Sequence, residues 1–114
     1  MADRQPPKKK LRTLDLTVVG LSYRVTPAKI EEMSGETPLK AELVREPDNS
    51  HDPNAVAVHL VEKPYMNFHI GYLSREVAKE VAPRLDKGME VEEAWLLAVD
   101  LVESKGQLQV KVRK

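Results

Sequence analysis

Short runs of alternating hydrophobic and polar residues dominate the chain, which is the pattern of half-buried β-strands. Leu14, Leu16 and Val18 follow this alternation, which shifts by one position at Gly20. A shift at a glycine is typical of a β-bulge or a barrel corner, so we expect strand structure to continue past Gly20. The same alternation predicts three further strands, at residues 37–44, 55–60 and 68–73.

Two segments have helical rather than strand signals. Thr26 is a suitable N-cap with proline next to it, which predicts a short helix over 28–33 that ends near Gly35. Ser74 is a second N-cap candidate, for a helix over 75–82. The proline after this helix predicts a kink, or a second turn that ends at Gly88.

The C-terminal quarter has the pattern of a hairpin. Residues 89–102 form a long apolar segment around Trp95, which we expect in the core. A turn at 103–106 leads to a strictly alternating strand at 107–113. Six or so short strands with one or two short helices predict a mainly β fold: a small six-stranded antiparallel barrel of the OB or SH3 type.

Length and composition narrow the class of protein. The 114 residues are enough for one domain with its own core, and there is no cysteine, which excludes disulfides and thiolate zinc sites. No apolar run approaches the ~20 residues of a membrane span. We therefore expect an intracellular protein without a membrane partner.

The net charge of zero is unevenly distributed along the chain. Residues 1–13 carry five basic and one acidic side chain, and residues 111–114 carry three basic ones. The 97 residues between them carry 10 basic and 17 acidic side chains, a net charge of −7. The body thus lacks the basic footprint usual in nucleic-acid binding, so any such contact must be local or helped by the basic ends.

Residues 1–13 have the composition of a disordered basic arm, which leaves residues 14–114 as the folded domain. The segment PPKKKLR suits a nuclear import signal, an arm that grasps phosphate or a plain solvated tail. The protein is accordingly expected in the cytoplasm or nucleoid, or in the nucleus of a eukaryote.

The segment REPDNSHDPNAVAV, residues 45–58, has more polar side chains than a turn between two strands needs. Prolines, an aspartate and an asparagine are ordinary turn residues, because they fix φ or bond to their own backbone. Three further polar residues exceed this requirement and are candidates for binding: Asn49, His51 and Asp52.

Metal binding and catalysis are the less favoured uses of this loop. Asp48, His51, Asp52 and His69 are possible ligands, but their spacing matches no calcium loop and no zinc pattern. Nothing in the sequence assembles a nucleophile with a base. We predict that the protein is not an enzyme and needs no cofactor.

Four motifs occur in order along the chain: VVGLSY (18–23), LVREPDNSHDPNAVAV (43–58), HIGYLSREVA (69–78) and VAPRLDKG (81–88). Together they resemble the HIRAN domain, over about residues 14–113. The resemblance implies a modified OB- or SH3-like barrel, found fused to helicases and nucleases and also free-standing in bacteria and phages. In fork-remodelling helicases this domain captures the 3′-hydroxyl end of single-stranded DNA.

The resemblance also implies roles for individual residues. Tyr23 corresponds to a tyrosine that stacks on a base, whereas Asn49 and Asp52 correspond to the polar residues that hold the terminal nucleotide. Tyr72 and Arg75 lie where relatives place further DNA contacts. Physical chemistry agrees for Asp52, because a carboxylate repels phosphate but accepts a hydrogen bond from a hydroxyl, which DNA offers at a strand end.

Three arginines could supply the positive field that the body lacks: Arg24, Arg45 and Arg75. Two positions depart from the DNA-end-binding relatives. His51 replaces a second stacking tyrosine, and Ser22 replaces an arginine that contacts phosphate.

The motifs and the charge distribution together leave two alternative functions. In the first, the module binds single-stranded DNA with a preference for a free 3′-hydroxyl end, and His51 stacks as a second ring. In the second, a non-enzymatic adaptor has lost DNA binding and contacts a protein partner, such as a helicase, a nuclease or a nucleoprotein complex.

Ordinary structural roles remain open for three of the residues. Tyr72 suits the barrel core or rim, and Arg45 suits an ion pair with Glu46 or a nearby carboxylate. His69 suits a plain strand position.

Overall fold

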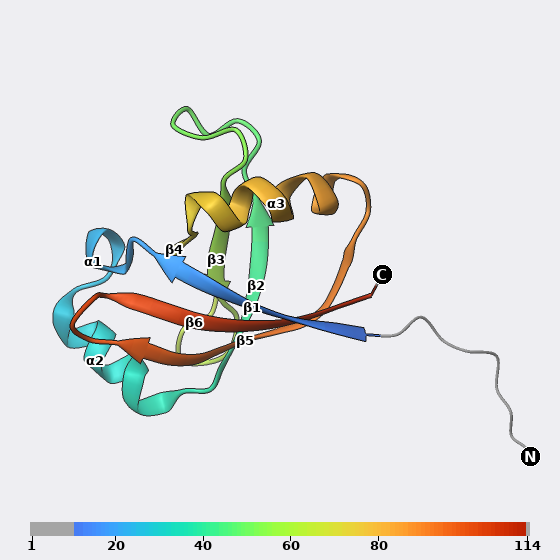
Figure 1. Cartoon of the computed structure of the whole chain (residues 1–114). Helices are drawn as coiled ribbons and strands as arrows, with labels where there is room; N and C mark the ends of the chain where they lie inside the picture. The colour runs from blue at the N-terminus through green and yellow to red at the C-terminus, as the bar shows by residue number, and fades with distance from the viewer. Residues whose placement is uncertain (1–10, 114) are drawn as a thin grey trace, which may run out of the picture.

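The computed structural model describes residues 11–113, and six antiparallel strands there close into a barrel (Figure 1). Neighbouring strands around the barrel follow the order β1-β4-β3-β2-β5-β6, with β6 next to β1. The predicted fold class, a mainly β six-stranded antiparallel barrel, is confirmed. The strands are β1 (Leu11–Val19), β2 (Leu39–Arg45), β3 (Val56–Leu60), β4 (Phe68–Leu73), β5 (Glu90–Asp100) and β6 (Lys105–Arg113).

The barrel begins earlier than the sequence pattern predicted. Residues 11–13, assigned to the basic arm, pair with β6 through Leu11↔Arg113, Arg12↔Val112 and Thr13↔Lys111. The rest of the predicted arm, residues 1–10, lies outside the described residues. No helix within residues 11–113 is both long and apolar enough to cross a lipid bilayer.

Within residues 11–113 three helices accompany the barrel, where the sequence predicted one or two, and the additional one is α1 (Leu21–Arg24). The expectation that strand structure continues past Gly20 is wrong. Gly20 has a φ of +83°, a left-handed conformation that glycine adopts at little cost, and it turns the chain out of β1 into this helix. The turn buries the Leu21 side chain and leaves that of Tyr23 outside.

The two predicted helices are present and extend further than expected. In α2 (Pro27–Glu36), the Oγ1 of Thr26 accepts a hydrogen bond from the Lys29 amide at 3.2 Å. In α3 (Arg75–Asp86), the Oγ of Ser74 accepts one from the Val77 amide at 3.4 Å. Pro83 neither ends α3 nor opens a separate turn: it lies inside the helix, which continues to Asp86 although proline removes one backbone hydrogen bond.

The core fills the barrel with aliphatic side chains from every strand, but Trp95 is not part of it. Trp95 is half-buried, and its indole N–H donates to the Glu93 carboxylate at 2.7 Å. The register of β5 against β6 shifts at two places, so Ala94 and Leu96 are the residues of this stretch that face inward. The most deeply buried side chains include Val18, Leu21, Met33, Leu60, Ile70, Leu96 and Leu108.

Of the five glycines, Gly71 in β4 leaves the least room for a side chain. A Cβ atom added there would collide with the Val19 carbonyl oxygen and crowd the Val18 and Leu21 side chains. Because the colliding atom is backbone, no side-chain rotation relieves the contact. The closure of the barrel between β4 and β1 therefore requires a glycine at this position.

We expect Gly71→Ala to lower the free energy of unfolding by about 3 kcal/mol, since a methyl group is forced into a filled site. Urea denaturation monitored by circular dichroism measures this. Gly35→Ala in α2 is the matched control, because nothing lies within 4 Å of a Cβ there. Its expected change is within about 1 kcal/mol of zero. Equal effects of the two substitutions would contradict the role of Gly71.

Candidate nucleic-acid interface

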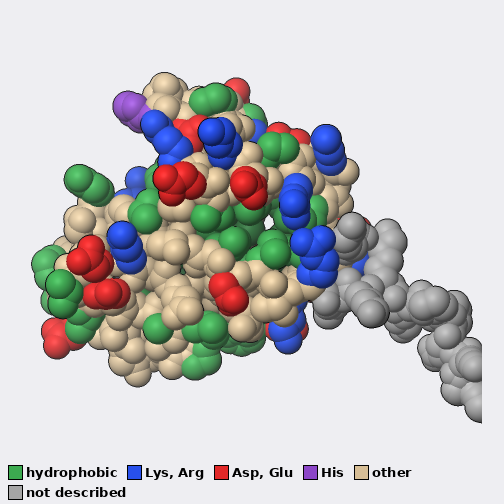
Figure 2. Space-filling model, viewed as in Figure 1, with side chains coloured by type: hydrophobic (Ala, Val, Ile, Leu, Met, Phe, Trp, Pro, Cys, Tyr) green, Lys and Arg blue, Asp and Glu red, His purple; other side chains and the backbone are tan. Residues whose placement is uncertain are grey.

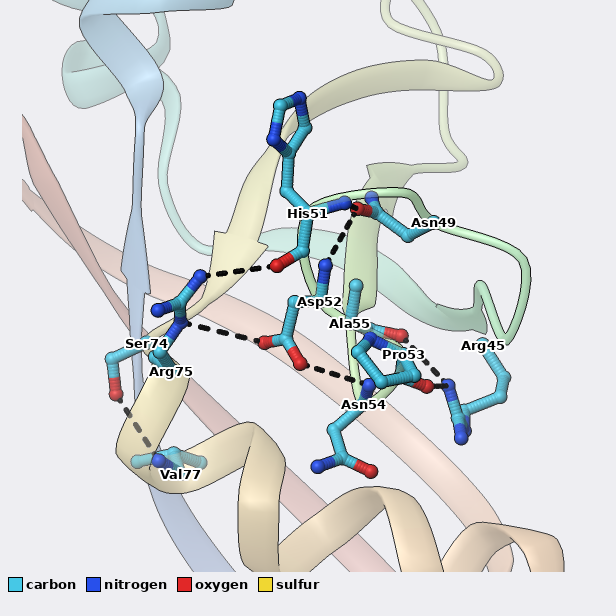
Figure 3. A network of polar contacts seen from close by, with 10 residues as sticks. All are labelled: Arg45, Asn49, His51, Asp52, Pro53, Asn54, Ala55, Ser74, Arg75 and Val77. Carbon is cyan, nitrogen blue, oxygen red and sulfur yellow. Dashed lines mark hydrogen bonds and ion pairs between the residues drawn. The ribbon is translucent and has the colours of Figure 1, made fainter.

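The loop between β2 and β3 is built by its own hydrogen bonds (Figure 3). Its base is closed by the Glu46 amide, which donates to the Ala55 carbonyl at 3.0 Å. Two tight turns then follow one another: the Asn49 amide donates to the Glu46 carbonyl at 3.1 Å, and the Ala55 amide donates to the Asp52 carbonyl at 3.0 Å. The loop therefore has a defined shape before any ligand is present.

Asn49 and Asp52, two of the predicted binding residues, also shape this loop. The side-chain Oδ1 of Asn49 accepts from the amides of His51 and Asp52 at 2.8 and 3.1 Å. Oδ1 of Asp52 accepts from the Asn54 amide at 2.9 Å. These three bonds are of the Asx type that stabilises turns. Asp52 keeps one oxygen, Oδ2, without a hydrogen bond in the described chain; the guanidinium of Arg75 lies 3.8 Å from it.

Glu46 joins this loop to the barrel, a role that the sequence analysis missed. Its Oε1 atom accepts a hydrogen bond from Asn49 Nδ2 at 3.0 Å and another from the Tyr72 hydroxyl at 3.0 Å. Partial burial opposes the charged form, but these two bonds and the charges of His69 and Arg24 outweigh it, so the pKa of Glu46 is lowered. The sequence signal for this role is the position of Glu46 in the R-E-P part of the loop motif.

Tyr72 lies on the barrel rim and holds this glutamate. Its hydroxyl group donates to Glu46, and burial together with this bond raises the pKa of Tyr72. The rings of Tyr72 and His69 meet edge to face, with centroids 4.9 Å apart. Of the two structural positions expected for Tyr72, core or rim, its half-buried side chain occupies the rim.

His69 is more than a plain strand residue. Its ring stacks on that of His59, its partner across β3 and β4, at 4.7 Å and an interplanar angle of 4°. Its Nε2 lies 2.9 Å from the Gly71 carbonyl oxygen, which can only accept, so Nε2 carries a proton. Burial and the charge of Arg24 lower the pKa of His69, and this favours the neutral ring.

Arg75 and His51 occupy the exposed side of the loop. The Arg75 guanidinium donates to the His51 carbonyl at 3.3 Å and lies beside Asp52, yet three quarters of its side chain is exposed. The His51 ring points away from the loop into solvent (Figure 3). An exposed cation and an exposed planar ring thus lie beside the partly buried carboxylate of Asp52.

Tyr23 and Arg24 lie on α1, which packs against β4. The Tyr23 side chain is 92% exposed, which is unusual for a large aromatic residue and leaves its ring open to a planar ligand. The charge of Arg24 affects the pKa values of Glu46, His69 and Tyr72, which places its guanidinium near this cluster. Arg24 therefore lies within electrostatic reach of Glu46, and Tyr23 is its neighbour on α1.

Arg45 lies on the other side of the loop and is engaged within the protein (Figure 3). Its Nε and Nη2 atoms donate to the two carboxylate oxygens of Asp86 in α3, each at 3.0 Å. Its Nη1 atom donates to the carbonyls of Pro53 and Ala55 at 2.7 and 3.3 Å. The expected ion pair thus forms with Asp86 rather than with Glu46, and it ties the loop to α3.

Hydrogen bonds and one ion pair connect five of the eight predicted residues through the loop: Asn49, His51, Asp52, Tyr72 and Arg75. Tyr23 and Arg24 lie apart from these contacts, on α1. Arg45, on the opposite side of the loop, stabilises it through a hydrogen bond to the Pro53 carbonyl. Across residues 11–113 there is no group of three or more His, Cys, Asp or Glu side chains placed to hold a metal ion.

The family model of the HIRAN domain matches residues 11–99. The chain belongs to the HIRAN domain family. The HIRAN domain is known as a DNA-binding module, a binding domain rather than a catalytic one. The match covers the loop, α1 and Arg75, and so it includes every residue of the site described above.

Two solved structures share the fold. The HIRAN domain of human HLTF has a TM-score of 0.66 and 24% identity, and the match covers 88% of this chain and 74% of that one. A protein from Lactobacillus plantarum has a TM-score of 0.69 and 21% identity over 92% of this chain and 98% of that one. Among curated proteins, none matches the sequence. Likeness at this level of identity concerns the fold.

We expect Glu46→Gln to remove a pH-dependent part of the stability. Because the folded-state pKa of Glu46 is lowered, its contribution is complete above the unfolded value of about 4.3 and is lost as the pH falls through the folded value. Urea denaturation between pH 3 and 7 should show the wild type to be more stable by about 1 kcal/mol at pH 7, with the difference shrinking toward pH 3. Glu62→Gln, at an exposed position, is the control. A constant difference across this range would contradict the role of the Glu46 charge.

Proposed function

We propose that this HIRAN protein binds single-stranded DNA and prefers an end with a free 3′-hydroxyl group. The observation that carries the proposal is the state of the Asp52 carboxylate, which has one oxygen committed to the loop and the other free of hydrogen bonds within the described chain. A free carboxylate oxygen accepts a hydrogen bond from a hydroxyl and repels a phosphate. It therefore favours a strand terminus over an internal nucleotide.

The terminal base would be held by aromatic rings. Tyr23 offers an almost fully exposed ring, and His51 offers a smaller one at the tip of the loop. Stacking on such rings tolerates any base, because every base has a π face. This supports recognition of a strand end without a preference for sequence.

The phosphate before the terminal nucleotide would meet Arg75 and Arg24. Arg75 is largely exposed and makes one 3.3 Å bond to a carbonyl, so most of its donors are free for a ligand. Arg45 has four of its five N–H donors committed to Asp86 and two carbonyls. We infer that Arg45 positions the loop and does not bind phosphate.

Asn49 would also act mainly through the loop. Its Oδ1 atom already accepts two backbone amides, and one hydrogen of its Nδ2 group is given to Glu46. A single N–H donor remains for a ligand. We infer that Asn49 sets the position of Asp52 and adds at most one direct contact to the nucleotide.

The alternative is an adaptor that has lost DNA binding, with a helicase, a nuclease or a nucleoprotein complex as its partner. The net charge of −7 on residues 14–110 favours it, since an acidic body repels DNA except where arginines gather. Absence of binding to any oligonucleotide at low salt would support the adaptor and overturn the first proposal.

The 3′-end preference can be measured by fluorescence anisotropy with two oligonucleotides that differ only in a 3′-hydroxyl or a 3′-phosphate group. We expect the hydroxyl form to bind about tenfold more tightly, and Asp52→Asn to remove most of that preference, because the amide keeps the turn bond but loses the charge. Asp48→Asn, on the exposed part of the same loop, is the matched control. Equal affinities for the two ends would exclude end recognition.

Arg75 and Arg45 should give opposite results when each is replaced by alanine. Arg75→Ala is expected to weaken DNA binding roughly fivefold and to reduce the slope of log affinity against log salt by about 0.7, the effect of one phosphate contact. Arg45→Ala is expected to leave that slope unchanged and to lower the free energy of unfolding by about 2 kcal/mol. Lys79→Ala, exposed on α3, is the control. A reduced slope for Arg45→Ala would assign phosphate contact to it as well.

A further inference from the structure

One edge of β1 is open along most of the strand. On one side β1 pairs continuously with β6 from Leu11 to Val18. On the other side, within the part of the chain that the structure describes, it pairs with β4 at Val18 and Val19 alone. Residues 11–17 therefore present a strand edge that no other described strand covers.

The backbone groups on this edge can be identified from one hydrogen bond. The carbonyl of Thr17 accepts from the Ser74 amide at 3.0 Å, so the backbone groups of Thr17 point away from β6. Groups two residues apart point to the same side of a strand, and the register with β6 has no shift. The N–H and C=O groups of Thr13 and Asp15 therefore also point to the open edge.

An apolar groove runs beside this edge, between β1 and α3. Two adjoining cavities, of about 460 and 320 Å³, share Arg12 and Arg84 as lining residues. Figure 2 shows hydrophobic side chains on the floor of the hollow below α3. The apolar lining consists of Leu14, Leu16, Val77, Val81, Met89 and Val112.

The charges of the groove are arranged along its length. Arg12, Arg84 and Lys87 line one end, and across residues 11–113 none of them forms an ion pair. Glu76 and Glu80 line the other part. In Figure 2, acidic side chains follow the upper rim of the hollow, while Lys and Arg gather at its right-hand end.

We propose that an extended segment of a partner protein binds here as an added strand, antiparallel to β1. Its backbone would pair with Thr13 and Asp15, and alternate side chains would enter the groove. Such a segment begins with a basic residue beside Glu76 and Glu80, continues with two apolar residues, and ends with an acidic residue at the cluster of three cations. An unpaired edge beside an apolar groove combines the two features that strand addition uses.

The groove suits a peptide better than nucleic acid. Its three cations attract phosphate at one end, but its floor is apolar and the glutamates along the other part repel a phosphate backbone, so a nucleic-acid strand finds no continuous basic path. The inference does not depend on DNA binding, because it uses neither the loop nor α1. It describes a surface that an adaptor or a DNA-binding module would have in common.

The test uses the full chain and a fluorescein-labelled peptide, Lys-Thr-Val-Thr-Val-Thr-Glu, whose charged and apolar residues share one face. We expect saturable binding in fluorescence anisotropy, and at least tenfold weaker binding when both valines are replaced by serine. Two further peptides carry N-methyl groups, one on the valines and the other on the threonines. Strand addition requires one of the two to lose binding while the other keeps it, because successive amides point to opposite sides.

Arg84→Glu should weaken binding of the peptide at least fivefold, whereas Lys79→Glu, elsewhere on α3, should leave the affinity for the peptide unchanged. The 3′-hydroxyl oligonucleotide, measured on the same variants, separates this inference from the proposed DNA site. No peptide binding, equal binding of the two N-methyl forms, or competition by the oligonucleotide would overturn the proposal. A dimer in sedimentation velocity that Asp15→Pro dissociates would place a second copy of the chain on this edge and also overturn it.

Discussion

The short pairing between β4 and β1 is the constraint on which the rest of the structure depends. The barrel closes at two residue pairs, Val18↔Leu73 and Val19↔Tyr72, and Gly71 permits the approach because it has no side chain. After this closure the chain leaves β1 through Gly20 into α1 and leaves β4 through Ser74 into α3. The two exits place Tyr23 on α1, which packs against β4, and Arg75 beside the loop, so a feature of the core sets the position of both exposed residues.

Tyr72 connects this closure to the loop, because the residue that pairs with Val19 also donates to Glu46. Glu46 in turn accepts a hydrogen bond from the Asn49 side chain. The side-chain oxygen of Asn49 accepts hydrogen bonds from the backbone amides of His51 and Asp52. The chain of bonds uses nearly all the polar capacity of Asn49 and half that of the Asp52 carboxylate. In both side chains, some atoms hold the loop in shape and others stay available to a ligand. A loop ordered in advance would bind a nucleotide without first losing much conformational entropy.

Alternation of residues and turn signals predicted all six strands, both longer helices and the loop, because these depend on local sequence. Gly20 shows where local reasoning failed: a glycine allows a bulge or a left-handed exit, and burial of Leu21 decided between them. Trp95 lies outside the core because the register of β5 against β6 shifts. Such shifts depend on the partner strand and cannot be recognised in the sequence of β5 alone. Arg45 was recognised as a candidate for an ion pair, yet its partner, Asp86, lies 41 positions away, beyond what spacing can reveal. Glu46 was hidden for the same reason, since Tyr72 is 26 positions away.

A domain with a net negative charge can still bind a DNA end if its specificity comes from repelling internal phosphates. A carboxylate at Asp52 makes an internal phosphate unfavourable there, and the net negative charge of the body penalises phosphates elsewhere. Binding is then favourable where an exposed ring, an exposed arginine and a hydroxyl acceptor meet, as His51, Arg75 and Asp52 do at the loop. A strongly basic surface would raise affinity for every phosphate and so blur the difference between an end and the middle of a strand. On the proposed function, the acidity of this protein contributes to its specificity, and the low intrinsic affinity that follows would be compensated by a protein partner that brings the domain to DNA.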